Sequence, residues 1–132
     1  MPDRYMLDTD VSSYVIRENP RTLLDVFVAH REAICISSIT YAELLYGLRN
    51  RYSERLERKI DQFVSLVRVM DWTACEARKY AELRHHLQRS GTPIGNMDML
   101  IAASALSVGA ALVTNNKKHF SCVPNLEIAD WL

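Results

Sequence analysis

Short apolar runs alternate with longer amphipathic stretches along this chain, and this alternation limits its fold more than any other feature. The runs with the length and character of strands are Tyr5–Leu7, Ala33–Ile36, Leu66–Met70 and Ala110–Val113, with a weaker fifth near Leu126–Ile128. Strands that alternate with helices indicate βαβ units, which build a parallel sheet covered on both faces. The sequence therefore predicts an α/β fold: a three-layer α/β/α sandwich with a mainly parallel sheet of four to five strands.

The composition fits one folded domain over residues 1–132. Apolar residues make up 48% of the chain, which argues against disorder, and no repeat, low-complexity tract or linker interrupts the pattern. Sixteen basic and sixteen acidic residues cancel. A neutral total gives no overall attraction to nucleic acid, so any such binding must come from a local basic patch.

The cysteines and the longest apolar run bear on the cellular compartment. Cys35, Cys75 and Cys122 show no CxxC spacing, which favours small buried thiols in a reducing compartment over disulfides or a zinc site. The first residues are charged, so we expect no signal peptide. The longest apolar run, Met99–Ala103, is too short to span a bilayer. We expect a cytoplasmic protein without a membrane partner.

Several helix boundaries can be predicted from local sequence. Thr40–Glu43 and Thr73–Glu76 both fit the capping box, in which a hydroxyl and a carboxylate satisfy the first backbone N–H groups. Asn96 is a candidate N-cap for a helix over Met97–Val108, which Gly109 ends. Because this last helix is apolar almost all round, we expect it to be the buried central helix.

Four acids interrupt the apolar pattern where strands end or helices begin. Asp8 directly follows the first strand, and Asp10 lies two residues further on. Glu43 and Asp98 each lie near the start of a predicted helix. Each of the last two has a purely structural interpretation, since Glu43 can complete the capping box and Asp98 can complement the helix dipole.

Taken together, Asp8, Glu43 and Asp98 favour a functional interpretation. In a doubly wound sheet all three positions fall on the side of the carboxyl ends of the strands. Carboxylates brought together repel one another unless cations neutralise them. Oxygen ligands of this kind suit Mg²⁺ or Mn²⁺, which can activate a water and stabilise a pentavalent phosphate.

The predicted fourth strand ends in polar residues at the same edge. Thr114, Asn115 and Asn116 follow Val113 directly. Asn favours turns, so simple turn chemistry explains them structurally. Functionally, they would orient a water, a phosphate or a metal-bound ligand.

Four motifs in this order resemble those of PIN-domain ribonucleases, and in particular the VapC toxins of bacterial toxin–antitoxin pairs: MLDTD, SSITYAELLYG, GNMDMLIAASAL and LVTNNKKHF. The resemblance covers essentially the whole chain. It implies that Asp8, Glu43 and Asp98 are the metal-binding acids of the site. It also places Thr114 and Asn116 on the motif of the fourth strand, among the catalytic residues.

The resemblance also implies an activity and partners. These are Mg²⁺- or Mn²⁺-dependent endonucleolytic cleavage of RNA, a homodimer, and inhibition by a small VapB antitoxin. The GTPIGNMD loop resembles that of the enteric VapC toxins, which implies tRNA as the substrate, with initiator tRNA as the expected species. Many family members carry an acid where Asn116 stands, and many carry Asn where Asp10 stands. We expect Asp10 to cap the first helix rather than to act as an outer-shell charge.

Other polar and aromatic residues have simpler interpretations. His85 and His86 lack the spacing of a metal-binding pair on a helix, so we expect them at the surface. Lys117–His119 form either a solvated turn or a contact for RNA phosphates. The basic run from Arg49 to Lys59 is interpreted as a solvated helix face, and Tyr46 as a packing residue.

Asp8 and Asp10 also allow two functions other than a ribonuclease. Asp8 and Asp10 form a DxD motif like that of haloacid-dehalogenase phosphatases, with Asp8 as nucleophile and Asp10 as general acid. That scheme lacks a late acidic pair and leaves Glu43 and Asp98 without a role. A non-catalytic regulatory domain would explain Asp8 and Asp10 as one cation pocket, but it does not explain Asp98.

Overall fold

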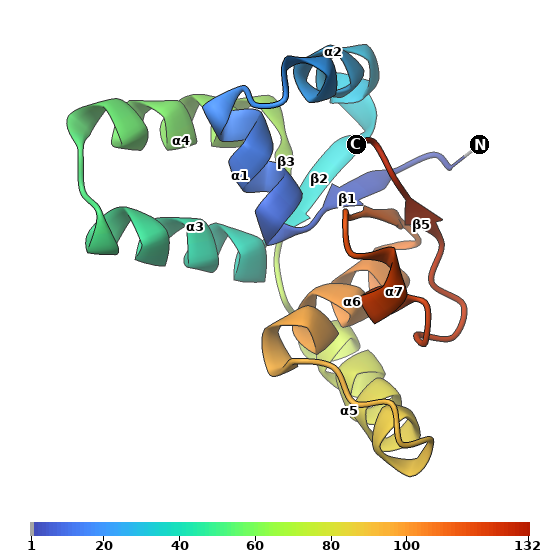
Figure 1. Ribbon diagram of the computed structural model, residues 1–132. Coiled ribbons are helices and arrows are strands. Elements are labelled where there is room, and N and C mark those ends of the chain that lie inside the picture. The colour runs from blue at the N-terminus through green and yellow to red at the C-terminus, as the bar shows by residue number, and fades with distance from the viewer. Residues whose placement is uncertain (1) are drawn as a thin grey trace.

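The computed structural model describes residues 2–132, in which helices flank a five-stranded sheet (Figure 1). The strands are β1 (Tyr5–Leu7), β2 (Ile34–Ser37), β3 (Arg68–Met70), β4 (Ala111–Val113) and β5 (Ile128–Ala129). The helices are α1 (Thr9–Arg17), α2 (Arg21–His30), α3 (Ser38–Asn50), α4 (Glu54–Leu66), α5 (Ala74–Arg89), α6 (Asn96–Val108) and α7 (Lys117–Phe120), with a 3-10 turn η1 (Arg31–Ala33) before β2. The predicted alternation of strands and helices is confirmed.

The sheet has the strand order β3-β2-β1-β4-β5, and every neighbouring pair is parallel. The chain winds outward from β1 through β2 to β3, and then returns to the other side of β1 with β4 and β5. The direction of winding therefore reverses between β1 and β4. In open α/β sheets, ligands bind at such a switch point, beyond the carboxyl ends of the strands.

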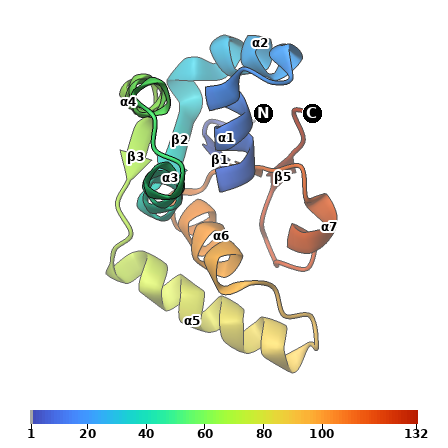
Figure 2. The same ribbon diagram turned by 60° about the vertical axis from the view of Figure 1, so that its left-hand side comes forward.

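Side chains on the central strands alternate between two separate cores. Tyr5 and Leu7 of β1 point into a core formed with α1–α4, whereas Met6 points into a core formed with α5–α7. Figure 2 shows the two groups of helices on opposite sides of the sheet. This alternation is what a parallel sheet buried on both faces requires. The predicted three-layer α/β/α sandwich is confirmed.

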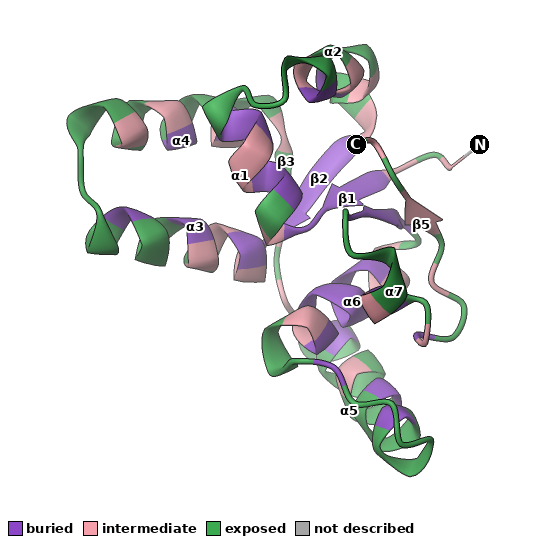
Figure 3. Ribbon diagram, viewed as in Figure 1, coloured by how far each residue is buried: buried purple, intermediate pink, exposed green. Residues whose placement is uncertain are grey.

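Helix α6 is the most buried helix, as its sequence predicts. Ala102, Ala103 and Ala105 have no exposed surface, and Figure 3 shows the buried positions gathered on α6 and the central strands. The small side chains allow α6 to lie close to the sheet. The indole Nε1–H of Trp72 donates to the backbone oxygen of Leu100 at 3.1 Å, which fixes α6 to the segment after β3.

The helix ends agree with the sequence at some positions and not at others. The Thr73–Glu76 capping box is confirmed, and Gly109 ends α6 with a φ of 67°. The Thr40–Glu43 capping box is wrong. Helix α3 begins three residues earlier, because Ser37 Oγ accepts from the Ile39 backbone N–H at 3.1 Å and is its N-cap. Helix α6 begins at Asn96 itself, after Gly95.

The three cysteines are free thiols in different environments. Cys35 is buried, and burial raises its pKa to about 11. Cys122 is partly buried, and Cys75 is exposed, so the expectation of buried thiols is wrong for Cys75. Among residues 2–132, no helix has the length and apolar character needed to cross a membrane.

Leu112 provides a test of the core on the α5–α7 side. Its side chain is fully buried on β4, next to the proposed switch point. We expect Leu112→Ala to lower the free energy of unfolding by about 2–5 kcal/mol, through lost burial and a residual cavity. Denaturant unfolding measures this change. Leu132→Ala is the control, because Leu132 is 48% exposed, and an equal loss in both variants would contradict this core.

Candidate functional site

Asp8 lies at the switch point and serves as the N-cap of α1. Its backbone N–H donates to the Val113 oxygen of β4 at 3.1 Å, and its Oδ1 accepts from the Val11 backbone N–H at 2.8 Å. The expectation that Asp10 caps this helix is therefore wrong, since Asp10 lies in its first turn. The cap fixes the direction of the Asp8 carboxylate relative to both strands.

The Asp8 carboxyl group binds its proton unusually tightly for an acid. Its pKa is raised from 3.8 to about 6, with burial as the largest cause. The nearby charges of Asp10 and Asp98 also raise the pKa, whereas hydrogen bonds from Thr114 and the Val11 backbone lower it. Repulsion among clustered acids raises the pKa of a carboxyl group, and it contributes to this shift. Burial, however, is its largest cause, and repulsion by the other acids is smaller.

Thr114 and Asn116 follow β4 at the same edge. Thr114 is fully buried, and its hydroxyl bonds the Asp8 carboxylate while accepting from the Asn116 backbone N–H at 3.0 Å. Asn116 is exposed and makes no side-chain cap for α7. Asn115 turns away, because its Nδ2 donates to the Tyr14 hydroxyl at 3.4 Å. Thr114 is thus in direct contact with Asp8, and Asn116 lies at the rim.

Asp98 enters the site from the opposite layer, in the first turn of α6. Its Oδ2 lies 2.8 Å from Nε2 of His119, which α7 supplies. The ring of His119 is held edge-on against Phe120, at 5.5 Å between centroids. His119 was assigned either to a solvated turn or to phosphate binding, and its contact with Asp98 was missed. The short helix α7 brings the two together, and nothing local in the sequence indicates this pairing.

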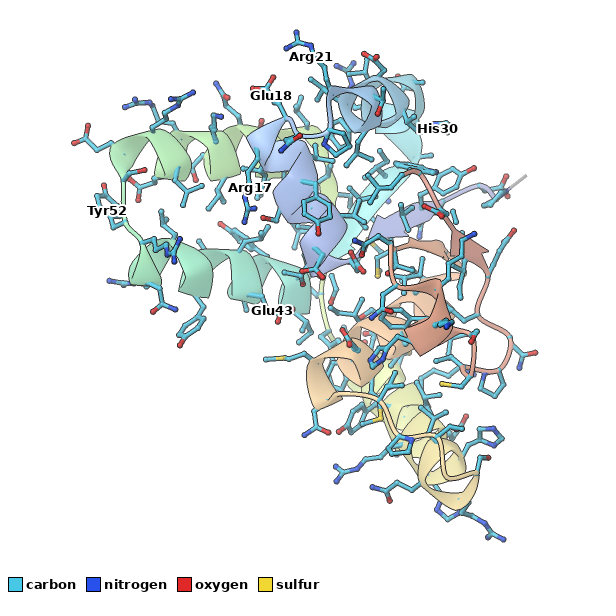
Figure 4. The ribbon with its side chains drawn as sticks, viewed as in Figure 1. Arg17, Glu18, Arg21, His30, Glu43 and Tyr52 are labelled. Carbon is cyan, nitrogen blue, oxygen red and sulfur yellow. The ribbon has the colours of Figure 1, made fainter. Side chains whose placement is uncertain are left out.

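Glu43 is connected to the site through Thr9. The Thr9 hydroxyl donates to Glu43 Oε1 at 2.5 Å and lies 3.3 Å from the hydroxyl of the buried Thr40. Since Ser37 caps α3, Glu43 is not needed at the helix terminus. Figure 4 shows Glu43 near the end of α3 that adjoins the start of α1. The role of Thr9, the residue after Asp8, was also missed by sequence analysis.

Ser37 links the helices that carry Glu43 and Asp98. Besides capping α3, its hydroxyl lies 3.0 Å from the Ser104 hydroxyl of α6, and both side chains are buried. Ser104 also donates to the Leu100 backbone oxygen one turn earlier. This buried bond joins the end of β2 to the centre of α6. It therefore sets the position of one acid-bearing helix relative to the other.

The three predicted metal ligands are not all in place to bind a metal. Asp98 is close enough to Asp8 to raise the pKa of Asp8, whereas Glu43 is held by Thr9. Within residues 2–132, no three His, Cys, Asp or Glu side chains form a group that could hold a metal ion as they stand. The donor set still suits a hard divalent cation, because it consists of carboxylate oxygens, one of them on the buried Asp8, whose pKa is raised to about 6.

The phosphatase interpretation receives no support from this geometry. Asp10 is exposed, and the site gives it no partner that would make it a general acid. Lys117 forms an ion pair with Asp130, at 3.4 Å between Nζ and Oδ2. Of the two lysines that could serve a phosphatase near its phosphate, Lys117 and Lys118, the first is therefore already engaged.

The raised pKa of Asp8 predicts a stability that depends on pH. The folded protein holds this proton up to about pH 6, whereas the unfolded chain loses it near pH 3.8. The free energy of unfolding contributed by Asp8 therefore decreases as the pH rises from 3.8 to about 6. We expect Asp8→Asn to gain up to about 3 kcal/mol relative to wild type on going from about pH 4 to about pH 7, without metal.

Asparagine is the right substitution because it caps helices as well as aspartate does. The measurement is chemical unfolding of both proteins at each pH in the presence of a chelator. Asp8→Ala is the control, because it also loses the cap, at a cost of about 1 kcal/mol at every pH. Parallel pH profiles for wild type and Asp8→Asn would contradict the burial of an ionisable carboxyl group here.

Comparison with known proteins places this fold and these motifs in a family. The family profile described as PIN domain matches residues 5–125. Ribonuclease VapC2 of Rickettsia felis is 40% identical over 130 residues, covering 96% of this chain and 97% of that protein. The tRNA(fMet)-specific endonuclease VapC of Shigella flexneri is 36% identical over 129 residues, covering 97% and 98%.

Solved structures give the same result. The crystal structure of VapBC2 from Rickettsia felis, bound to a DNA fragment from its promoter, contains a chain that superimposes with a TM-score of 0.91 at 38% identity, covering 97% of this chain and 98% of that one. DNA-bound VapBC from Salmonella typhimurium gives 0.89 at 36% identity, covering 98% of each chain. The chain therefore belongs to the VapC group of the PIN-domain family.

Proposed function

We propose that this protein is a metal-dependent endoribonuclease toxin that cleaves tRNA, with initiator tRNA as its substrate. The observation that carries the proposal is the meeting of Asp8, Asp98 and Thr114 at the switch point of a PIN-domain fold. The VapC relative from Shigella flexneri is named as a tRNA(fMet)-specific endonuclease, which supports the choice of substrate. Because the proposed substrate is a tRNA, we propose that this protein acts in the cytoplasm.

Asp8, Glu43 and Asp98 are the proposed ligands of Mg²⁺ or Mn²⁺. When bound, the ion would activate a water and neutralise the charge that develops on the phosphate. Thr114 is the proposed positioning residue for Asp8, since its hydroxyl bonds that carboxylate. Asn116 is exposed at the rim, with its amide free of helix capping, and is proposed to contact the substrate phosphate.

A VapB-type antitoxin is the proposed inhibitor. The support comes from the solved relatives, since the structures from Rickettsia felis and Salmonella typhimurium are of VapBC bound to DNA. We also propose a homodimer. Exposed apolar side chains on α3 and α6 favour it: Tyr46 is 68% exposed, Met97 50% and Leu45 39%. Tyr46 was expected to be a packing residue within the chain, and this expectation is wrong.

Purified protein incubated with total cellular RNA and Mg²⁺ tests the activity. We expect discrete cleavage of tRNA, with Mn²⁺ able to replace Mg²⁺. A chelator removes the activity if a divalent cation is required. Cleavage that continues in the chelator would contradict the metal dependence, and intact RNA in both cations would contradict the ribonuclease.

Asp98→Asn tests the three-acid site. The substitution keeps the size of the side chain but removes one proposed ligand charge, so we expect cleavage to fall by at least about 100-fold. We expect the melting temperature of the metal-free variant to be unchanged or raised, because repulsion of Asp8 is relieved. Mg²⁺ should raise the melting temperature of the wild type more than that of the variant, since a ligand stabilises the state that binds it.

Asp25→Asn is the matched control for this substitution, because Asp25 is an exposed acid on α2, outside the site. It should cleave RNA and respond to Mg²⁺ as the wild type does. If Asp98→Asn also behaves in this way, Asp98 serves only the dipole of α6 and the contact with His119, and the proposed site is wrong.

The homodimer is tested by the mass of the protein in solution. The chain has a mass of 15.1 kDa, and we expect twice this value at tens of micromolar by light scattering. Tyr46→Asp should shift the mass toward the monomer, because it places a charge among the exposed apolar side chains. A strictly monomeric wild type would contradict the dimer.

A further inference from the structure

A recess lies at the edge of the sheet where the parallel strands begin, opposite the edge that carries the acids. It has a volume of about 230 Å³, and its lining comes from the residues before β1, the turn η1, and the first residues of β2 and β3. In Figure 1, β1 and β2 run from this edge toward the starts of α1 and α3, where the candidate site is built. The length of the strands therefore separates the recess from the candidate site.

Three arginines from three different segments line this recess. Arg4 precedes β1, Arg31 begins η1 and Arg68 begins β3. Arg4 is partly buried, whereas Arg31 and Arg68 are exposed. Within residues 2–132, no ion pair involves any of the three. Their guanidinium groups are therefore available to an anionic ligand.

The buried thiol of Cys35 lies close to two of these arginines. Burial raises the pKa of Cys35 to about 11, and the positive charges of Arg4 and Arg68 act against this rise. The interaction of two charges weakens with distance, so both guanidinium groups lie near the Cys35 side chain. Cys35 is on β2, which lies between β1 and β3 in the sheet, and it lines the recess. Arg4 and Arg68 therefore converge on the recess from the two strands that flank β2.

Two acids, Asp3 and Glu32, line the same recess. Both are exposed, and among the described residues neither forms an ion pair. A carboxylate accepts hydrogen bonds from hydroxyl groups, whereas it repels a second anion. The recess therefore favours a ligand with one anionic group for the arginines and hydroxyl groups for the acids. A strand of nucleic acid fits less well, because its successive phosphates would meet these acids.

The arginines and the size of the recess indicate the class of ligand. A guanidinium group suits phosphate, because it donates two parallel hydrogen bonds to the phosphate oxygens. A volume of about 230 Å³ is below the roughly 300–1,000 Å³ of pockets for larger organic ligands, so the ligand is small. We propose that this recess binds a small phosphate ester of a polyol, with its phosphate on the three arginines and its hydroxyl groups on the two acids. This site goes beyond the proposed ribonuclease function and does not depend on it.

Calorimetric titration in metal-free buffer tests the binding, with β-glycerophosphate as the probe. We expect it to bind more tightly than inorganic phosphate, and glycerol not to bind. Arg4→Gln and Arg68→Gln should each weaken binding of the probe at least about tenfold, because each removes charge-assisted hydrogen bonds. Arg68→Lys should lie between Arg68→Gln and the wild type, because lysine keeps the charge but not the paired donors. Arg78→Gln is the matched control, since Arg78 is an exposed arginine of α5 outside the recess.

Two further measurements locate the ligand and test its hydroxyl contacts. In amide NMR spectra we expect β-glycerophosphate to cause saturable shifts at Cys35 and Arg68, and none at Asp98 of the candidate site. Glu32→Ala should reduce the preference for β-glycerophosphate over inorganic phosphate, because it removes an acceptor for a hydroxyl group while leaving the arginines in place.

Several results would overturn the proposal. If Arg4→Gln and Arg68→Gln bind the probe as Arg78→Gln does, or if the NMR shifts appear at the candidate site instead, the recess is not the binding site. Shifts that grow without saturating would show only general screening of charge. An unchanged preference in Glu32→Ala would contradict a polyol ester. Should Arg4→Gln fail to fold, Arg31→Gln and Arg68→Gln carry the test, because they change exposed side chains.

RNA cleavage separates this proposal from the proposed function. Arg68→Gln should cleave RNA as the wild type does, because the recess lies at the other edge of the sheet. If Arg68→Gln loses both tRNA binding and cleavage, the recess belongs to an RNA-binding surface and the inference is wrong. A wild-type protein that binds β-glycerophosphate in the expected pattern but cleaves no RNA would contradict the proposed function and leave the recess assignment in place.

Discussion

The structure depends on the way Asp8 joins the sheet to the first helix. Its backbone bonds β4, its carboxylate caps α1, and the Thr114 hydroxyl holds the same carboxylate. A buried carboxylate is costly without compensating hydrogen bonds, and these bonds offset the free-energy cost of burying Asp8. The same interactions that let the fold bury an acid also keep that acid in one orientation at the switch point. Stability and site geometry therefore share one side chain.

The fold was predictable because its signals are local and repeated. The apolar runs, the Thr73–Glu76 capping box and Gly109 each act over a few residues and each was correct. The errors occurred where a helix start had more than one candidate cap. Ser37 precedes Thr40 and reaches the first free N–H groups earlier, and Asp8 does the same relative to Asp10. When two neighbouring residues can both cap a helix, the position at which the preceding strand ends decides which of them is the N-cap.

The candidate acids were also found from sequence, but their partners were not. Thr9 bonds Glu43 across 34 residues, and Ser37 meets Ser104 across 67. His119 meets Asp98 only because α7 lies beside α6. Such contacts are set by the packing of the layers, and no spacing within one helix or strand indicates them. The charge near the site follows the same rule: a chain with no net charge still brings Arg17 and Arg51 together beside the acids, where α1, α3 and α4 meet.

The site draws Asp8 and Glu43 from elements on one side of the sheet, and Asp98 and His119 from elements on the other. The two cores are separated by the strands, and the buried bond between Ser37 and Ser104 joins the end of β2 to α6 near this edge. Side chains repack within a layer more easily than whole layers shift. Catalytic competence in such an arrangement depends on the alignment of two layers, so a shift of one helix layer against the other would separate the acids while both cores stay packed.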